Sequence, residues 1–191
     1  METSETNDHL GGHLNRTNID EGALQWLIHR FEPKSFVDVG CGPGGMVDLA
    51  LSEGLDAMGI DGDPNVAGDF IHKHDFSIEP YYPPRKYDVG WSVEFVEHVY
   101  EKYMTNYMPI FRMCKFVVAT YAPPGTPGHH HVNLQEEPYW IEKFKDNGLT
   151  FDLALTTELR NSSTMNLNKK SHEKRFVQKR GMVFVNDFIQ P

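Results

Sequence analysis

Two glutamates and a histidine lie close together in the chain at spacings that suit catalysis. Glu94, Glu97 and His98 are spaced i, i+3 and i+4, so a helix beginning here would carry all three on one face. An imidazole is a common general base, and a carboxylate beside it can orient it or bind a cation. The spacing therefore predicts a catalytic role for His98 and Glu94.

Three consecutive histidines, His129 to His131, form a second candidate for the same site. If the backbone from Gly128 to Val132 is extended, His129 and His131 point to one side of it and His130 to the other. Carboxylates and imidazole nitrogens together are good ligands for a divalent ion. We therefore predict a Mg²⁺ or Mn²⁺ site, with His131 also taking part in catalysis, and its ligands would be Glu94, Glu97, His98 and His131, or His129 in place of His131.

A glycine-rich turn marks a separate binding site nearer the N-terminus. From Phe36 to Gly45 the chain has the sequence FVDVGCGPGG, in which an apolar, β-prone run breaks into a turn. Glycine permits positive φ there and lets a ligand approach without a Cβ in the way. A helix after the turn would point its unpaired N–H groups at the ligand. The pattern predicts a cofactor site at Gly40, Gly42 and Gly44.

Asp38 indicates which cofactor this turn binds. Such turns occur in both dinucleotide and S-adenosylmethionine sites, so the glycines alone do not distinguish them. Asp38 lies two residues before Gly40, at the expected carboxyl end of the strand, where it suits an ammonium group. S-adenosylmethionine carries an ammonium group and NAD does not. Cys41 and Pro43 also fit the dinucleotide spacing poorly.

A second acid follows at the distance expected for a ribose contact. Asp61 ends the predicted second strand, 21 residues after Gly40, near the spacing at which a βαβ unit places a carboxylate on a ribose diol. The alternative is a turn-forming aspartate, since Asp63, Pro64 and Asn65 all favour turns. With the glycine turn present, we assign Asp61 to the ribose.

These residues resemble motif I of the class I S-adenosylmethionine-dependent methyltransferases, and the resemblance spans about residues 19–155. It implies S-adenosylmethionine as the cofactor and adds three contacts to it. After the third strand, Asp75 would accept from the adenine amino group and Phe76 would pack on the ring. The third contact is Ser92, at the end of strand four. The motif I residues are Asp38, Gly40, Cys41, Gly42, Pro43 and Gly44.

The Glu-x-x-Glu-His string with a later histidine is similar to Mg-dependent O-methyltransferases. These are the ubiquinone-pathway enzymes and the small-RNA 3′-terminal 2′-O-methyltransferases, in which the metal grips a vicinal diol. Many small-molecule methyltransferases carry a similar string with no metal, which leaves His98 as a general base. Motifs of amino-methylating and cytosine-C5 DNA enzymes are absent from the sequence.

The expected activity is methyl transfer to a hydroxyl, or another nucleophile, of a small polar or sugar-like acceptor. One alternative is a ribose 2′-O-methyltransferase for RNA 3′ ends. Two others are an NAD-dependent oxidoreductase and a catalytically inactive cofactor-binding module that regulates a partner. The net charge of −9 argues against a general nucleic-acid binder.

The positions of these motifs require an alternating α/β chain. A flexible polar arm, residues 1–17, precedes a single domain from 18 to 191, and a helix from Ile19 to Phe31 leads into the first strand. Alternation of strands and helices predicts a doubly wound, Rossmann-like seven-stranded sheet. It would be mostly parallel, with an antiparallel terminal strand and helices on both faces. The last two strands are expected at 149–155 and 181–185, and one helix is expected from Ser92 through Phe111.

Composition adds limits on location and partners. No apolar run has the ~20 residues of a membrane helix, and two cysteines make no disulfide framework, so a cytoplasmic location and no membrane partner are expected. Between Arg160 and Arg180 the chain has seven basic residues and one acid, Glu173. Either this segment is a solvated loop, or it borders the acceptor entrance and attracts an anion.

Overall fold

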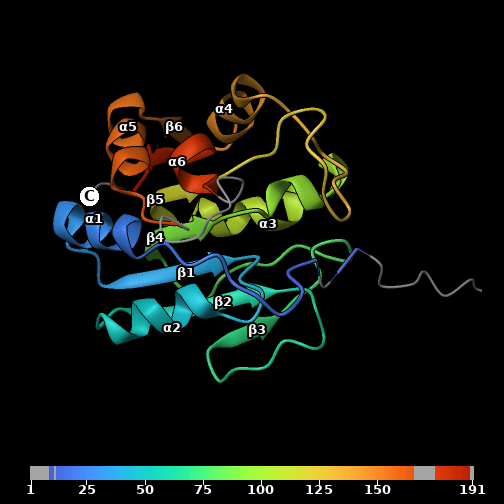
Figure 1. The fold of residues 1–191 in the computed structure, drawn as a ribbon, viewed down its shortest axis with the longest axis horizontal. Coiled ribbons are helices and arrows are strands. Elements are labelled where there is room, and N and C mark those ends of the chain that lie inside the picture. Colours follow the sequence, from blue (N-terminus) through green and yellow to red (C-terminus); the bar gives the residue numbers. More distant parts are fainter. Residues whose placement is uncertain (1–8, 11, 166–174, 190–191) are drawn as a thin grey trace, which may run out of the picture.

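A seven-stranded sheet forms the centre of the protein in a computed structural model that describes residues 9–10, 12–165 and 175–189 (Figure 1). The strand order is β3-β2-β1-β4-β5-β7-β6. All neighbouring strands pair in parallel except at β7, which is antiparallel to both β5 and β6. The strands are β1 (Ser35–Val39), β2 (Asp56–Asp61), β3 (Ile71–Lys73), β4 (Tyr87–Ser92), β5 (Cys114–Ala119), β6 (Leu149–Phe151) and β7 (Met182–Asn186).

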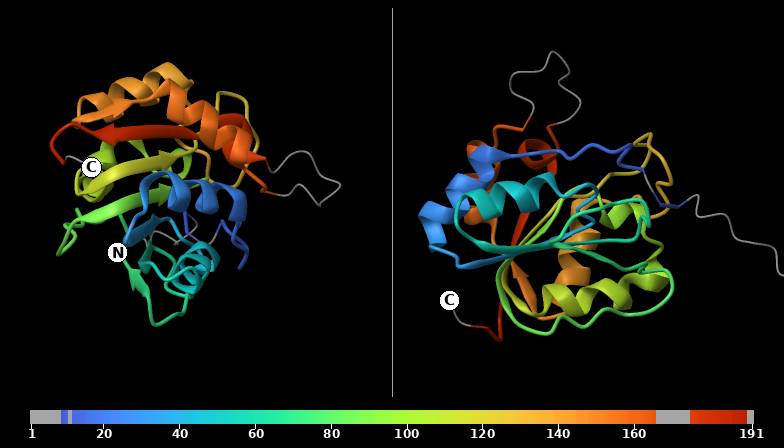
Figure 2. Two further views of the ribbon diagram at one scale, coloured as in Figure 1. Left: turned by 90° about the vertical axis from the view of Figure 1, so that its left-hand side faces the viewer. Right: turned by 90° about the horizontal axis from the view of Figure 1, so that it is seen from below.

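Helices cover both faces of this sheet, as Figure 2 shows for α2 on one side and α3 on the other. One core packs α1, α2, α5 and α6 against the sheet, and the other packs α3 and α4 against the opposite face. The predicted doubly wound fold, with its antiparallel strand, is therefore confirmed. The helices are α1 (Glu21–Phe31), α2 (Gly45–Ser52), α3 (Met104–Phe111), α4 (Glu137–Lys145), α5 (Leu153–Ser162) and α6 (Phe176–Arg180).

The alternation of side chains along β1 shows how a central strand serves two cores. Phe36 packs in the α1/α2 core, whereas Val37 and Val39 pack in the α3/α4 core. All five residues of β1 are buried, as expected for a strand of a parallel sheet with helices on both faces. The one charged residue among them, Asp38, therefore needs a functional explanation.

The helix predicted from Ser92 through Phe111 is wrong over its first half. Glu94 has a φ of 58°, and only short 3₁₀ turns, η1 (Val96–His98) and η2 (Glu101–Tyr103), precede α3. The physical reason is a long-range competition for backbone groups. The Glu94 N–H donates to Thr120 Oγ1 at 2.8 Å, and the Glu97 carbonyl accepts from Val132 and Asn133, so neither group joins a helical ladder.

The predicted strand at 149–155 is too long, and a helix was missed after it. Strand β6 ends at Phe151, and Asp152 caps α5 by accepting from the Leu155 N–H at 2.9 Å. Leu155 and Leu159 then pack in the core one helical turn apart. The basic stretch expected between two strands therefore includes helical residues of α5 and α6, while its residues 166–174 lie outside the described part.

Residues 9–10 and 12–17, which belong to the predicted N-terminal arm, run across the carboxyl ends of β1 and β2 (Figure 1). The Gly45 N–H at the start of α2 donates to Thr17 Oγ1 at 3.0 Å, which fastens this segment to the helix. Among the described residues, no helix combines the length and apolar character needed to cross a bilayer.

Candidate functional site

One large cavity opens at the carboxyl edge of the sheet, where β1, β2, β4 and β5 end. Open α/β sheets bind their ligands at this edge. Its volume of about 1130 Å³ exceeds that of an ordinary small-molecule pocket, so it has room for a cofactor and a second reactant. The predicted site residues that line it are Asp38, Gly40, Gly42, Asp61, Asp75, Phe76, Glu94, His98, His129 and His131.

The glycine turn forms one wall of this cavity. Gly40 and Gly42 have φ of 78° and 51°, in the left-handed region that a side chain rarely adopts. A Cβ on Gly40 would lie 2.4 Å from the Phe95 ring, so glycine is also required by space. The turn thus leaves bare backbone facing the cavity and Phe95 beneath it.

Asp38 is a buried acid with an unusual lack of partners. Its side chain is 3% exposed, yet no hydrogen bond or ion pair from any described residue reaches its carboxyl. Burial, and then the nearby Asp61, raise the pKa of Asp38 well above its usual range. A cationic ligand in the cavity would relieve both effects, because it would supply the missing counter-charge.

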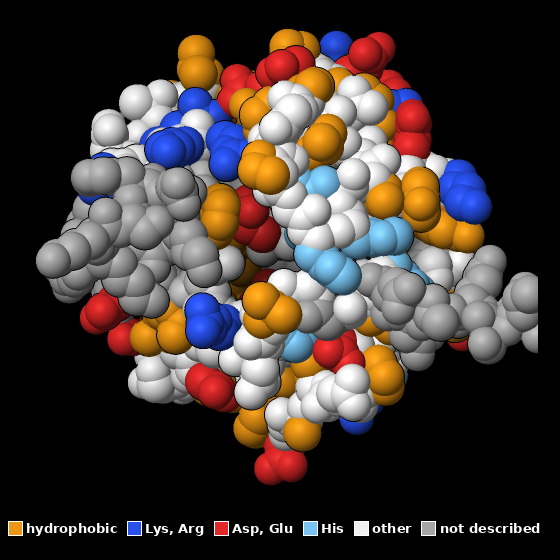
Figure 3. All heavy atoms as spheres, turned by 45° about the vertical axis from the view of Figure 1, so that its right-hand side comes forward, with side chains coloured by type: hydrophobic (Ala, Val, Ile, Leu, Met, Phe, Trp, Pro, Cys, Tyr) orange, Lys and Arg blue, Asp and Glu red, His pale blue; other side chains and the backbone are white. Residues whose placement is uncertain are grey.

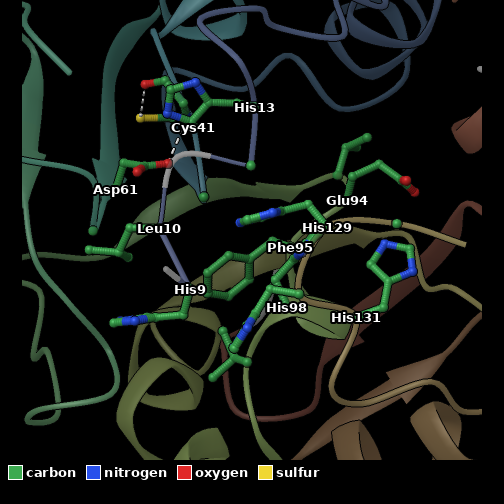
Figure 4. Close-up of a pocket in the computed structure, with 18 of the residues that line it drawn as sticks. His9, Leu10, His13, Cys41, Asp61, Glu94, Phe95, His98, His129 and His131 are labelled. Carbon is green, nitrogen blue, oxygen red and sulfur yellow. Dashed lines mark hydrogen bonds between the residues drawn. The ribbon is translucent and has the colours of Figure 1, made fainter. Parts of the chain in front are cut away.

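Asp61 lies at the end of β2 with its carboxyl turned toward the glycine turn (Figure 4). Its Oδ2 accepts from the Gly42 N–H at 2.7 Å, and its Oδ1 accepts from the Asp63 N–H at 2.9 Å. Each oxygen keeps a second lone pair, so the carboxylate can also accept from a ligand hydroxyl. Asp63 itself lies 3.1 Å from His13 of the arm and does not line the cavity.

Asp75 and Phe76 follow β3 on the far side of the cavity. Asp75 Oδ1 accepts from the Ser77 N–H at 2.8 Å, while its Oδ2 lies 3.0 Å from His9 Nε2. Leu10 lies beside Gly62, close to the backbone of Asp75. The arm therefore contacts the residues expected to hold an adenine ring, and a ligand there would share Asp75 with His9.

A second cluster combines one carboxylate with two imidazoles. Ligand atoms of Glu97, His98 and His131 all lie within 4.8 Å of one another, which suits a bound metal ion. Burial, and then His131, lower the pKa of His98 to about 4, so its ring is neutral near pH 7 and keeps a lone pair. No other group of this kind occurs within the described ranges.

The loop after β5 determines which histidine joins this cluster. His130 has a φ of 48°, so the loop is not extended, and His129 and His131 point in different directions (Figure 4). His131 Nδ1 lies 3.0 Å from the Thr126 carbonyl, a contact that needs a proton on Nδ1 and leaves Nε2 free. His131 is therefore the histidine that the geometry places with His98, and His129 is not.

Glu94 stands beside the cluster and interacts with it through Glu97. Neither carboxyl oxygen of Glu97 accepts a hydrogen bond from a described donor, but the Glu94 carboxyl is near enough to share a proton with it. Burial raises the pKa of both glutamates, and their mutual repulsion raises that of Glu94 further. Two desolvated carboxyls beside His131 and the neutral His98 form a site that suits a cation.

Two residues predicted to contact the cofactor have other roles in the structure. Ser92 is fully buried and donates through its hydroxyl to the Val39 carbonyl at 3.0 Å, which ties β4 to β1, and it does not line the cavity. Gly44 lies behind the turn as the N-cap of α2, where a Cβ would meet Ile71 at 2.8 Å. Both therefore shape the site from outside it.

The arm and α6 bring further residues to the cavity. Those of the arm were not predicted, whereas those of α6 belong to the basic stretch for which a position at the acceptor entrance was one of the two alternatives. His9 and His13 come from the arm, and Lys179 and Arg180 come from α6. The two histidines gave no local signal, because their contacts are with aspartates more than 45 residues away. Figure 3 shows histidines, carboxylates and basic side chains around the hollowed face.

No family profile matches the chain, and no curated protein is similar to it in sequence. Solved structures of several methyltransferases share its fold. Magnesium protoporphyrin IX methyltransferase from Synechocystis PCC 6803, with bound S-adenosylmethionine, aligns with a TM-score of 0.52 at 16% identity, over 68% of this chain and 66% of that chain.

Two further structures align over more of the chain. Phosphoethanolamine N-methyltransferase 2 from Haemonchus contortus gives a TM-score of 0.55 at 17% identity, over 86% of this chain and 52% of that chain. The methyltransferase domain of bacterial CtHen1 gives 0.55 at 13% identity, over 86% and 96%. The chain thus has the fold of class I S-adenosylmethionine-dependent methyltransferases. It spans about two thirds of the length of the protoporphyrin enzyme and about half of the length of the phosphoethanolamine enzyme.

The raised pKa of Glu97 predicts how its removal changes stability with pH. A carboxyl whose pKa is higher in the folded state binds more protons folded than unfolded, so the free energy of unfolding falls as pH rises from about 5. Glu97→Gln removes this loss. With chelator present, we expect the free energy of unfolding of the variant to exceed that of the parent by about 1 kcal/mol or more at pH 8. The difference should shrink at pH 5.

Urea unfolding of both proteins at the two pH values measures this. Glu53→Gln, at an exposed position, is the matched control and should change stability little at either pH. A Glu97→Gln protein less stable than the parent at pH 8 would show that the carboxylate is well solvated in place.

Proposed function

We propose that this protein is an S-adenosylmethionine-dependent methyltransferase that methylates a hydroxyl of a small polar acceptor. The observation that carries the proposal is Asp38, a buried carboxyl that has no hydrogen-bond or ion-pair partner among the described residues and lines the cavity of a methyltransferase fold. The cofactor supplies an electrophilic methyl group. Its methionine portion bears an ammonium group, which would be the cationic partner of the Asp38 carboxyl.

The remaining cofactor contacts follow from the wall residues. Gly40 and Gly42 leave room for the ligand to approach the backbone, and Asp61 can accept from ribose hydroxyls with its free lone pairs. Asp75 can accept from the adenine amino group beside Phe76. Together these groups favour S-adenosylmethionine over NAD, because NAD has no ammonium group to balance Asp38.

The proton of the acceptor hydroxyl is the chemical problem left to the protein. We assign it to the cluster of Glu97, His98 and His131, with Glu94 beside it. A divalent ion held by these side chains would lower the hydroxyl pKa and orient a diol. The residues suit such an ion: the Glu97 carboxyl accepts no hydrogen bond from a described donor, and the His98 imidazole is neutral at pH 7. Without a metal, neutral His98 is the general base.

The placement of the ribose can be tested with Asp61→Ala. This change removes a charged acceptor, and hydrogen bonds to charged groups contribute about 1.5–3 kcal/mol each. We expect the affinity for S-adenosylhomocysteine to fall about tenfold or more in titration calorimetry.

Asp69→Ala, which removes an exposed aspartate outside the cavity, is the matched control and should bind as the parent does. Melting temperatures of both variants would show whether the turn at Gly42 survives without Asp61. Parent-like affinity in a folded Asp61→Ala protein would place the ribose elsewhere.

Neighbouring histidines offer a matched test of the metal site. With S-adenosylhomocysteine bound, we expect His131→Ala to weaken Mn²⁺ binding about tenfold or more, because a ligand is lost. His129→Ala should leave it within about threefold, since His129 lies outside the cluster. Titration calorimetry or electron paramagnetic resonance would measure both.

Three results would revise the chemistry. If only His129→Ala weakens Mn²⁺ binding, His129 is the metal ligand in place of His131. If the parent protein binds no Mn²⁺, His98 remains as the general base. A protein that binds the cofactor but never forms S-adenosylhomocysteine with any hydroxylic acceptor would be a regulatory module instead.

A further inference from the structure

Basic side chains line the cavity next to its acidic cluster. Lys179 and Arg180, at the end of α6, border the same space as Glu94 and His98. Figure 3 shows Lys and Arg side chains close to the carboxylates in the hollow. In a protein with a net charge of −9, such a local positive wall attracts one small anion better than it attracts a long polyanion.

Arg180 is held in place but forms no ion pair with an acid of the described residues. Its Nη1 donates to the Tyr121 carbonyl at 3.2 Å, and its guanidinium lies 5.9 Å from the Phe176 ring centre. Within the described part of the chain, no carboxylate lies within 4.0 Å of it. By contrast, three other arginines contact a carboxylate directly: Arg30, Arg85 and Arg160.

Pairing with the two glutamates does not explain the position of Arg180. It lines the same cavity as Glu94, but it forms an ion pair with neither Glu94 nor Glu97. A divalent ion on Glu97, His98 and His131 would balance those acids, and Arg180 and Lys179 would then remain as excess positive charge. A guanidinium presents a planar fork of donors that matches the oxygens of a phosphate.

We propose that Arg180 and Lys179 bind a phosphate group of the methyl acceptor, which is therefore a small phosphorylated compound with free hydroxyls. This inference rests on the proposed methyltransferase function and names its class of substrate. Two cations that line one cavity match the charge of a phosphate dianion, whereas a single carboxylate would leave one of them unbalanced. The phosphate at α6 and the hydroxyl at the histidine cluster would orient the acceptor across the cavity.

Two sugars that differ only in the phosphate test this assignment. The protein is first loaded with S-adenosylhomocysteine and Mg²⁺, and the dissociation constants of ribose 5-phosphate and ribose are measured by NMR titration. For the parent we expect ribose 5-phosphate to bind at least about tenfold more tightly. Arg180→Gln should reduce this advantage to about threefold or less, and Arg180→Lys should keep part of it because the charge remains.

Arg112→Gln is the matched control, because Arg112 is exposed, does not line the cavity and is not part of α6. It should keep the full preference for the phosphate. The melting temperature of each variant shows whether it is folded. If Arg180→Gln is not folded, the comparison is made with Arg180→Lys instead.

The outcomes separate this inference from the function on which it rests. A parent that does not bind S-adenosylhomocysteine contradicts the methyltransferase proposal itself. A parent that binds it but shows no preference for ribose 5-phosphate, or binds neither sugar, overturns the phosphate assignment alone. Equal weakening of both sugars by Arg180→Gln also overturns it, since that result would make Arg180 a counter-charge for the glutamates.

Discussion

The buried carboxyl of Asp38 is the constraint on which the site depends. It lies in the central strand of a sheet covered on both faces, where water cannot solvate its charge, and Asp61 adds a second negative charge nearby. The glycine turn leaves open space in front of it, and no lysine or arginine of the described residues forms an ion pair with it. A cationic ligand completes this arrangement, and it would bind where the backbone is bare.

The same electrostatic argument applies a second time, across the cavity. Glu94 and Glu97 are desolvated together, and the loop after β5 places His131 beside neutral His98. One acidic site faces the glycine turn and the other faces the side that we propose for the acceptor. Arg180 and Lys179 add positive charge to the cavity wall, and among the described residues neither forms an ion pair with an acid of these two sites. The proposed sites for a cation, a metal and an anion would therefore lie at separate places in the cavity.

Local sequence was sufficient wherever local contacts determine the structure. The strand, turn and helix from Ser35 to Ser52 depend on apolar alternation and on glycines that must take positive φ, so they were predictable. The segment from Ser92 to Phe111 was not, because Thr120 and the loop at 132–133 capture the backbone groups of Glu94 and Glu97. The helix α5 was predictable in principle, since Asp152 is an N-cap before leucines at helical spacing. The arm was not, because its histidines meet aspartates far along the chain.

A crystal structure of the protein grown with S-adenosylhomocysteine tests the central claim most directly. The account predicts that the ligand amino group lies within hydrogen-bonding distance of the Asp38 carboxyl, beside the turn at Gly40 and Gly42. Density that places the amino group away from Asp38, or the ligand outside this cavity, would contradict it.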